Sequence, residues 1–300
     1  MAVPSSARVR RLLLAWYRRD GRALPWRLTT EPYAILVSEL MLQQTPVARV
    51  VPRYEAWLDR FPTLAALADA PTGDVLRQWQ GLGYNRRALA LQRCAQAVVA
   101  DGGALPQDDA ALRALPGIGP YTAAALRCFA FGQPIAPLDV NLLRVLHRLQ
   151  GHTGAPPRTA AAGLRRFADD VVHSNDPPAV ANALMDLGAT ICTARAPQCG
   201  ACPLMHLCPS SHRVVIAPRR RAGASFVGSD RQLRGRLLAA VVAGPHRGLS
   251  LAAIHRRWPL RPRPQRARLA TLAKALEADG LLQRRSNGRG VHLQLPKRKG

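Results

Sequence analysis

Four cysteines near residue 200 form a compact group of potential metal ligands. Their spacing is C-x6-C-x2-C-x5-C, at Cys192, Cys199, Cys202 and Cys208, and only two other cysteines occur in the chain. Four thiolates on one short loop can bind a common centre with little loss of chain entropy, and they suit zinc or an iron-sulfur cluster. Structural zinc sites more often use two C-x2-C pairs separated by a longer loop, so the spacing alone leaves both centres open.

One acid lies inside a strongly apolar segment. Glu39 stands in the run PYAILVSELMLQQT at residues 32–45, where most neighbours are aliphatic. Loss of water disfavours the charged carboxylate, so we expect a raised pKa and a proton donor near neutral pH. The structural alternative is that Glu39 forms an ion pair with an arginine such as Arg87.

A second acid follows a glycine-containing turn. The run LPGIGPYTA at residues 115–123 contains Gly117 and Gly119, which permit a tight turn whose NH groups and following helix start could bind a phosphate. An ordinary helix end followed by a proline start is the simpler interpretation. Asp139 lies sixteen residues beyond this run, where it could cap a helix or act in chemistry.

Helices must position these groups. Apolar residues recur at intervals of three and four through about residue 210, with Pro and Gly between the repeats and no sustained alternation. This pattern predicts an all-α domain over residues 1–210. We expect its helices near 7–19, 32–44, 46–60, 63–69, 73–78, 84–101, 108–114, 119–130, 140–150, 158–172 and 178–189.

The remaining residues form a different module. A basic linker is expected over 211–229. Three helices should follow, one capped by Asp230 and running to about 243, one capped by Ser250 and running to 257, and one over 265–279. Segments 281–285 and 290–295 flank Ser-Asn-Gly as a hairpin would. Three helices and a hairpin predict a small winged-helix-like domain over 230–300, for DNA contact or for packing alone.

Charge favours a polyanionic partner. The 300-residue chain has a net charge of +25, and residues 212–300 hold 21 Lys and Arg against three Asp and Glu. No stretch is apolar and long enough to span a membrane. The only lysines are Lys274, Lys297 and Lys299, so residues 1–273 offer no lysine for a Schiff base.

Six motifs together carry a family resemblance. SELMLQQT at 38–45, GLGY at 81–84, LPGIGPYTA, LDVN at 138–141, MDLGA at 185–189 and the four cysteines resemble, in order and spacing, the MutY-type adenine DNA glycosylases. The resemblance covers about residues 10–210. It implies a helix-hairpin-helix glycosylase fold, a [4Fe-4S] cluster, and excision of adenine paired with 8-oxoguanine or guanine in base excision repair.

The resemblance also implies residue roles. Glu39 would protonate the adenine base, and Asp139 would stabilise the sugar cation with Tyr121 and Asn141 nearby. The resemblance also implies Gln43, Gln44 and Tyr84 as DNA contacts during base flipping, although Tyr84 could equally be a core residue. Gly117, Gly119 and Arg195 are candidate phosphate contacts, although a single exposed arginine is usually only a solvated charge. The cysteines would hold the cluster.

Tyr121 occupies the position where endonuclease III-type enzymes have a strand-cleaving lysine, which predicts a monofunctional glycosylase. Thymine or uracil mismatch glycosylases share this tyrosine and stay an alternative, as does a non-enzymatic DNA-binding protein. Val140 replaces a frequent family glycine. The usual Nudix-like C-terminal domain is not evident, so the opposite-base preference stays open. We expect a monomer acting on double-stranded DNA at the bacterial nucleoid in the cytoplasm, without membrane contact.

Overall fold

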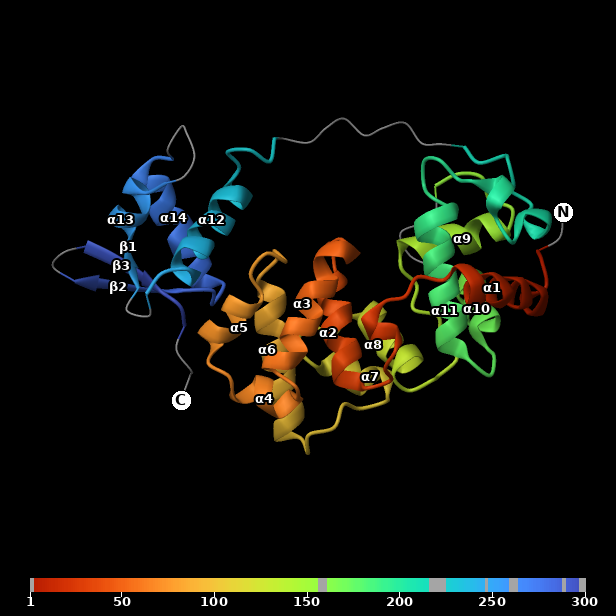
Figure 1. The fold of residues 1–300 in the computed structure, drawn as a ribbon, viewed down its shortest axis with the longest axis horizontal. Coiled ribbons are helices and arrows are strands. Elements are labelled where there is room, and N and C mark those ends of the chain that lie inside the picture. Colours follow the sequence, from red (N-terminus) through yellow and green to blue (C-terminus); the bar gives the residue numbers. More distant parts are fainter. Residues whose placement is uncertain are drawn as a thin grey trace. The chain divides into compact units, whose positions relative to one another are not determined.

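The computed structural model describes residues 3–155, 161–215, 225–245, 248–258, 264–287 and 290–296. The chain folds into two compact units, and each is made of segments that are distant in the sequence. The first comprises Met1–Glu39, Leu105–Ala114 and Ile118–Arg220; the second comprises Leu40–Ala104, Leu115–Gly117 and Arg221–Gly300. Figure 1 shows the helical character of both. No described helix has the length and hydropathy needed to cross a membrane.

The first unit is built from helices whose apolar faces meet in one core. In α9 the buried residues Leu142, Val145, Leu146 and Leu149 recur at three and four, so one stripe faces inward. α1 packs against α10 and α11, and α11 also contacts α8 and α9. The elements are α1 (Ser6–Asp20), η1 (Pro25–Arg27), the start of α2 (Pro32–Leu42), α7 (Asp109–Ala114), α8 (Pro120–Phe129), α9 (Val140–Leu149), α10 (Ala162–Val172), α11 (Pro177–Asp186), the π-helical turn η2 (Leu187–Ile191), and the short 3-10 turns η3 (Cys199–Ala201) and η4 (Met205–Leu207).

A buried ion-pair cluster joins the N-terminal segment to α11. Asp186 is 1% exposed. Arg27 donates to both of its carboxylate oxygens at 2.7 and 2.8 Å, and the side chain of Arg22 adds a third bond at 2.7 Å. Burial alone would raise the pKa of Asp186, but these hydrogen bonds hold it below its usual value. The acid in MDLGA is therefore structural in this fold.

The second unit contains four further helices around an aromatic core. They are α3 (Val47–Arg60), α4 (Leu64–Asp69), α5 (Thr72–Gln78) and α6 (Arg86–Ala100), and α6 packs against both α4 and α5. Trp57 is fully buried and meets Phe61 and Trp79 edge to face, with ring centroids 5.0 and 5.4 Å away.

The C-terminal residues of this unit form three helices and a small sheet. The elements are α12 (Asp230–Val242), β1 (Leu249–Ser250), α13 (Leu251–Arg256), α14 (Arg266–Ala278), β2 (Gln283–Asn287) and β3 (Gly290–Gln294). The antiparallel strand order is β1-β3-β2. Three helices and a short three-stranded sheet are the elements that the sequence predicted for a winged-helix-like module. The two-residue strand β1 was not predicted because it is too short to show alternation.

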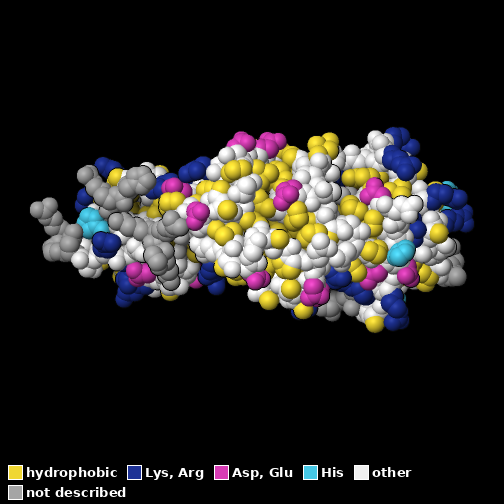
Figure 2. Space-filling view, turned by 90° about the horizontal axis from the view of Figure 1, so that it is seen from below, with side chains coloured by type: hydrophobic (Ala, Val, Ile, Leu, Met, Phe, Trp, Pro, Cys, Tyr) yellow, Lys and Arg dark blue, Asp and Glu magenta, His cyan; other side chains and the backbone are white. Residues whose placement is uncertain are grey.

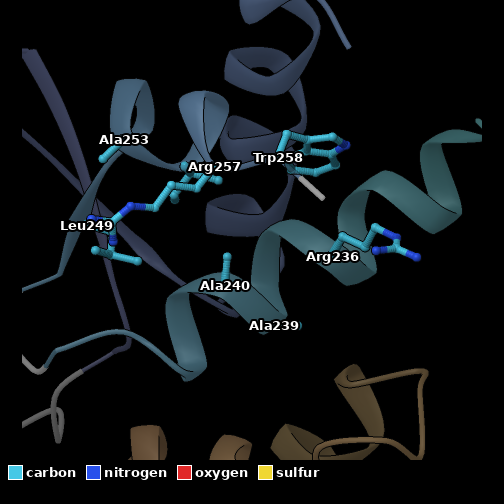
Figure 3. Close-up of a pocket in the computed structure, with 8 residues that line it drawn as sticks. Arg236, Ala239, Ala240, Leu249, Ala253, Arg257 and Trp258 are labelled. Carbon is cyan, nitrogen blue, oxygen red and sulfur yellow. The ribbon is translucent and has the colours of Figure 1, made fainter. Parts of the chain in front are cut away.

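Small side chains leave a recess in this C-terminal module. A cavity of about 320 Å³ lies among α12, β1 and α13, where Ala239, Ala240 and Ala253 face it. Figure 3 shows Arg236 projecting from α12 and Arg257 extending from the end of α13.

Most predicted helices lie within a few residues of the observed ones. Ser250 caps α13 as expected, its hydroxyl accepting from the Ala253 NH at 3.1 Å. Ser229, rather than the predicted Asp230, caps α12. Much of the predicted linker, residues 216–224, and part of the predicted hairpin turn, residues 288 and 289, lie outside the described residues.

Candidate active site

The first unit brings Glu39, Tyr121 and Asp139 together. Glu39 lies near the C-terminal end of α2 and is 6% exposed. Burial raises its pKa to about 7, with a smaller rise from the negative charge of Asp139, while a hydrogen bond from the Tyr121 hydroxyl acts in the opposite direction. This contact differs from the structural alternative, an ion pair with an arginine, because the hydrogen-bond partner of Glu39 is the neutral Tyr121 hydroxyl. Near neutral pH this carboxyl group is poised to carry a proton.

Asp139 is both an N-cap and a neighbour of Glu39. One carboxylate oxygen accepts from the backbone NH groups of Asn141 at 2.8 Å and Leu142 at 2.7 Å, and the other accepts from the Asn141 amide at 2.8 Å. Burial raises the pKa of Asp139, whereas these three hydrogen bonds favour the charged form. Val140 begins α9 at 70% exposure with no left-handed backbone, so a glycine is not needed there.

A buried arginine that sequence reasoning missed connects this acid to the cysteine loop. Arg144 donates to the Asn141 side-chain oxygen at 2.8 Å, to the Gly188 carbonyl at 2.6 Å and to the Cys192 carbonyl at 2.8 Å. Gly188 is required for close approach, because a Cβ there would lie 2.7 Å from the Asn141 Cβ. The i+3 spacing of Asn141 and Arg144 was the one local signal for this network.

The four cysteines line one small cavity of about 30 Å³, together with Arg148. Among described residues, no three His, Cys, Asp or Glu side chains are arranged to hold a single metal ion. A four-iron cluster instead takes one thiolate per iron, so its ligands need not converge on one point. Arg148 is 5% exposed and donates to the Cys192 sulfur at 3.1 Å. Four thiol groups with a buried cationic donor fit an anionic iron-sulfur cluster.

The two glycines of the 115–123 run serve different purposes. Gly117 has a φ of +85°, and a Cβ there would meet the Ala90 Cβ at 2.8 Å, so only glycine fits. Gly119 is extended at φ −96° and caps α8, and a Cβ there would meet nothing within 4 Å. Its open surroundings leave the start of α8 accessible to a phosphate.

Gln44 and Tyr84 are exposed residues on strained backbone. Their φ values are +55° and +46°, in the left-handed region that non-glycine residues seldom adopt. Tyr84 is 41% exposed. Gln43 precedes this strained position and is half-buried, and Arg195, between the first two cysteines, is exposed.

Arg87 holds the two strained turns together within the second unit. Its guanidinium donates to the carbonyl of Leu40 in the last turn of α2 at 2.6 Å and to that of Gln43 just after α2 at 2.5 Å. It also donates to the Gly83 carbonyl beside Tyr84 at 3.0 Å. Thr45 contributes a further acceptor at 3.1 Å. Arg87 therefore caps the end of α2 and fixes the turns on both sides, a role that only the folded contacts reveal.

Comparisons with known proteins agree with this arrangement. A family model described as HhH-GPD superfamily base excision DNA repair protein matches residues 37–168, and the iron-sulfur binding domain of endonuclease III matches residues 192–208. A thermostable thymine-DNA glycosylase structure matches with a TM-score of 0.63 and 28% identity, covering 70% of this chain and 97% of that one. An endonuclease III–DNA complex matches in fold, with a TM-score of 0.58 and 22% identity, over 69% of this chain and 97% of that one. The fold and cysteine loop thus define a helix-hairpin-helix DNA repair glycosylase with a [4Fe-4S] site.

Comparison with relatives of similar sequence shows which family of DNA glycosylases the chain belongs to. The adenine DNA glycosylase of Mycobacterium tuberculosis H37Rv is 43% identical over 92% of this chain and 91% of its own length. The human adenine DNA glycosylase is 41% identical over 67% of this chain and 39% of its own. The chain belongs to the adenine DNA glycosylase family.

Proposed function

We propose that this protein excises adenine from duplex DNA where adenine is paired with 8-oxoguanine or guanine, and that it leaves the abasic strand uncut. The observation that carries the proposal is a buried carboxyl group, Glu39, with a pKa of about 7 beside a hydrogen-bonded second acid, Asp139. The names of the relatives support adenine as the base. We place its work in the bacterial cytoplasm, as a monomer acting on double-stranded DNA.

Glu39 acts first as an acid. Adenine leaves poorly as an anion, so a proton delivered to the base, at N7, weakens the bond from its N9 to the sugar. As that bond breaks, the sugar acquires positive charge, and the Asp139 carboxylate stabilises it. Water adds to the sugar carbon and gives up a proton to Glu39, which restores the acid. Tyr121 and Asn141 hold the two carboxyl groups in place through the hydrogen bonds described above.

Gln44 and Tyr84 enter the base stack of the DNA duplex while the adenine nucleotide is flipped out. Extruding a base costs a few kcal/mol, and side chains that enter the gap offset part of that cost. Both residues are exposed and lie on left-handed backbone, and Arg87 donates hydrogen bonds to the residue before each of them, which supports the two turns for insertion. Gln43 adds a contact beside them. Gly117 and Gly119 present backbone NH groups to a phosphate.

The cysteines Cys192, Cys199, Cys202 and Cys208 hold the [4Fe-4S] cluster. When bound, the cluster fixes the fold of the loop over residues 192–208 and supplies no step of base removal. The loop presents Arg195 to a DNA phosphate.

Single-turnover base release tests the proposal. Duplexes with A:8-oxoguanine, A:G, T:G or U:G pairs are incubated with excess protein, then treated with alkali to cut abasic strands. We expect release of adenine alone, strand cleavage only after alkali, and no borohydride-trapped adduct. Release of thymine or uracil but not adenine would favour the second candidate, a mismatch glycosylase like the structural relative. Absence of any release would favour a DNA-binding protein.

A further inference from the structure

We propose that the C-terminal module carries a second binding site for duplex DNA, on the solvent face of α14 and the adjoining end of α13. It contacts the phosphate backbone and does not depend on a damaged base. This goes beyond base removal, because it assigns a partner to a part of the chain outside the glycosylase site.

The acids of this module are already neutralised. Residues 212–300 contain only Asp230, Glu277 and Asp279 against 21 Lys and Arg. Asp230 pairs with Arg268 at 2.7 Å, Glu277 with Arg284 at 2.5 Å, and Asp279 with Arg234. Each acid thus engages at least one arginine. By composition this segment has eighteen more Lys and Arg residues than Asp and Glu residues. Such an excess favours a polyanion.

The solvent face of α14 has the form that a DNA groove requires. Leu269, Leu272, Ala273 and Leu276 are buried, and the helix packs against α12 and α13. The exposed residues at spacings of four, three and four are Ala267, Thr271, Lys274 and Ala278. Three of these side chains are short, so the helix backbone can approach a groove closely. A 13-residue helix is about 20 Å long, enough to lie along a major groove about 12 Å wide.

Basic side chains flank this face. Arg266 begins α14 and is exposed, with its Nε 3.5 Å from His255 Nδ1 at the end of α13. Arg256 and Arg257 are exposed at the same end of α13. Lys and Arg side chains are visible over the C-terminal module at the left of Figure 2. In helix-turn-helix proteins the second helix of such a pair enters the groove while flanking cations bind phosphates.

The same surface does not suit a membrane. Binding in a lipid interface needs large apolar side chains opposite a basic face. The exposed face of α14 offers alanine, threonine and lysine instead. Duplex DNA is therefore the occupant that fits both the charge and the shape.

Salt-dependent binding of the full chain to an undamaged duplex tests the site. In Arg266→Ala/Lys274→Ala we expect weaker binding, and a plot of log affinity against log salt that is flatter by about 2, because each lost phosphate contact contributes about 0.9 to the slope. Thr271→Glu, which removes no cation but places a negative charge on the face, should weaken binding as well. Thermal unfolding of each variant checks that it is folded.

Two matched controls make the result specific. Arg266→Lys/Lys274→Arg keeps both charges and should bind as the parent protein does. Arg8→Ala/Arg11→Ala removes two exposed charges from α1, and its slope should lie closer to the parent value than the slope of Arg266→Ala/Lys274→Ala does. The proposal is overturned if the α14 and α1 variants lose affinity equally, if only single-stranded DNA binding changes, or if only binding to phosphatidylserine vesicles changes. Adenine release at saturating protein stays at the parent rate, so failure here leaves the proposed activity standing.

Discussion

At the scale of single residues, the most important feature is the buried carboxyl group of Glu39. A carboxyl group that is 6% exposed normally needs a cationic partner, yet its hydrogen-bond partner here is the Tyr121 hydroxyl. The fold therefore tolerates a proton on this group up to about pH 7. Asp139 receives three NH hydrogen bonds instead, which favour its charged form and oppose the rise in pKa that burial causes.

The raised pKa of Glu39 has a consequence for stability. In the unfolded chain this group loses its proton near its ordinary pKa of 4.5, whereas in the folded protein it does so near 7. Between pH 4.5 and 7 the folded state therefore binds more protons than the unfolded state. The stability that protonated Glu39 contributes is lost as the pH rises through about 7. The shift corresponds to about 3 kcal/mol.

Glu39→Gln should remove this dependence. We expect the variant to gain stability relative to the parent as the pH rises from about 4.5 to about 7, and the difference to level off above that. Denaturant unfolding at several pH values measures it. A difference that stays constant over this range would mean that Glu39 titrates normally in the folded protein.

At the scale of elements, Arg87 of α6 organises two turns. It supplies hydrogen bonds to carbonyls at the end of α2 and beside Tyr84, all within the second unit. Without it, these carbonyls lose a partner, and an acceptor that water cannot reach costs about 1–3 kcal/mol.

Arg87→Ala should lower the free energy of unfolding by about 3 kcal/mol and weaken DNA binding, because the strained positions of Gln44 and Tyr84 lose their support. Arg87→Lys has fewer donors, so its free energy of unfolding and its DNA affinity should lie between those of the parent protein and Arg87→Ala. Urea unfolding and duplex binding measure both effects. Arg93→Ala in the same helix is the matched control, and an equal loss in that variant would contradict the role given to Arg87.

Local spacing predicts some of these elements and misses others for a physical reason. The stripe of Leu142, Val145 and Leu146 repeats within α9 itself, so the helix was predictable. Besides nearer partners, Arg87 and Arg144 each bond carbonyls that are 44 to 48 residues away in the sequence. A local sequence pattern cannot predict such contacts. The cysteines were predictable as a group because their short spacing limits where they can meet.

At the scale of the whole molecule, the cysteine loop and the glycosylase site are linked through Arg144. Its contacts run from the Cys192 carbonyl to Asn141, which bonds Asp139. Loss of the cluster should therefore disturb the site as well as the loop.

Cys199→Ser should lower the iron content and the broad visible absorbance of the purified protein, and lower its adenine release in parallel. Iron analysis alongside single-turnover rates measures this link. Cys94→Ser, a change at a buried cysteine outside the loop, is the control for a general packing defect. Full adenine release by a Cys199→Ser protein that contains no iron would show that the glycosylase site does not depend on the cluster.

The central claim is that Glu39 delivers a proton to adenine, and single-turnover release from an A:8-oxoguanine duplex across pH tests it most directly. The account predicts that the parent rate falls as the pH rises through about 7, and that Glu39→Gln is slower by about 10² to 10⁴ while binding the duplex normally. A variant that releases adenine at the parent rate, or a parent rate that rises through that pH range, would contradict it.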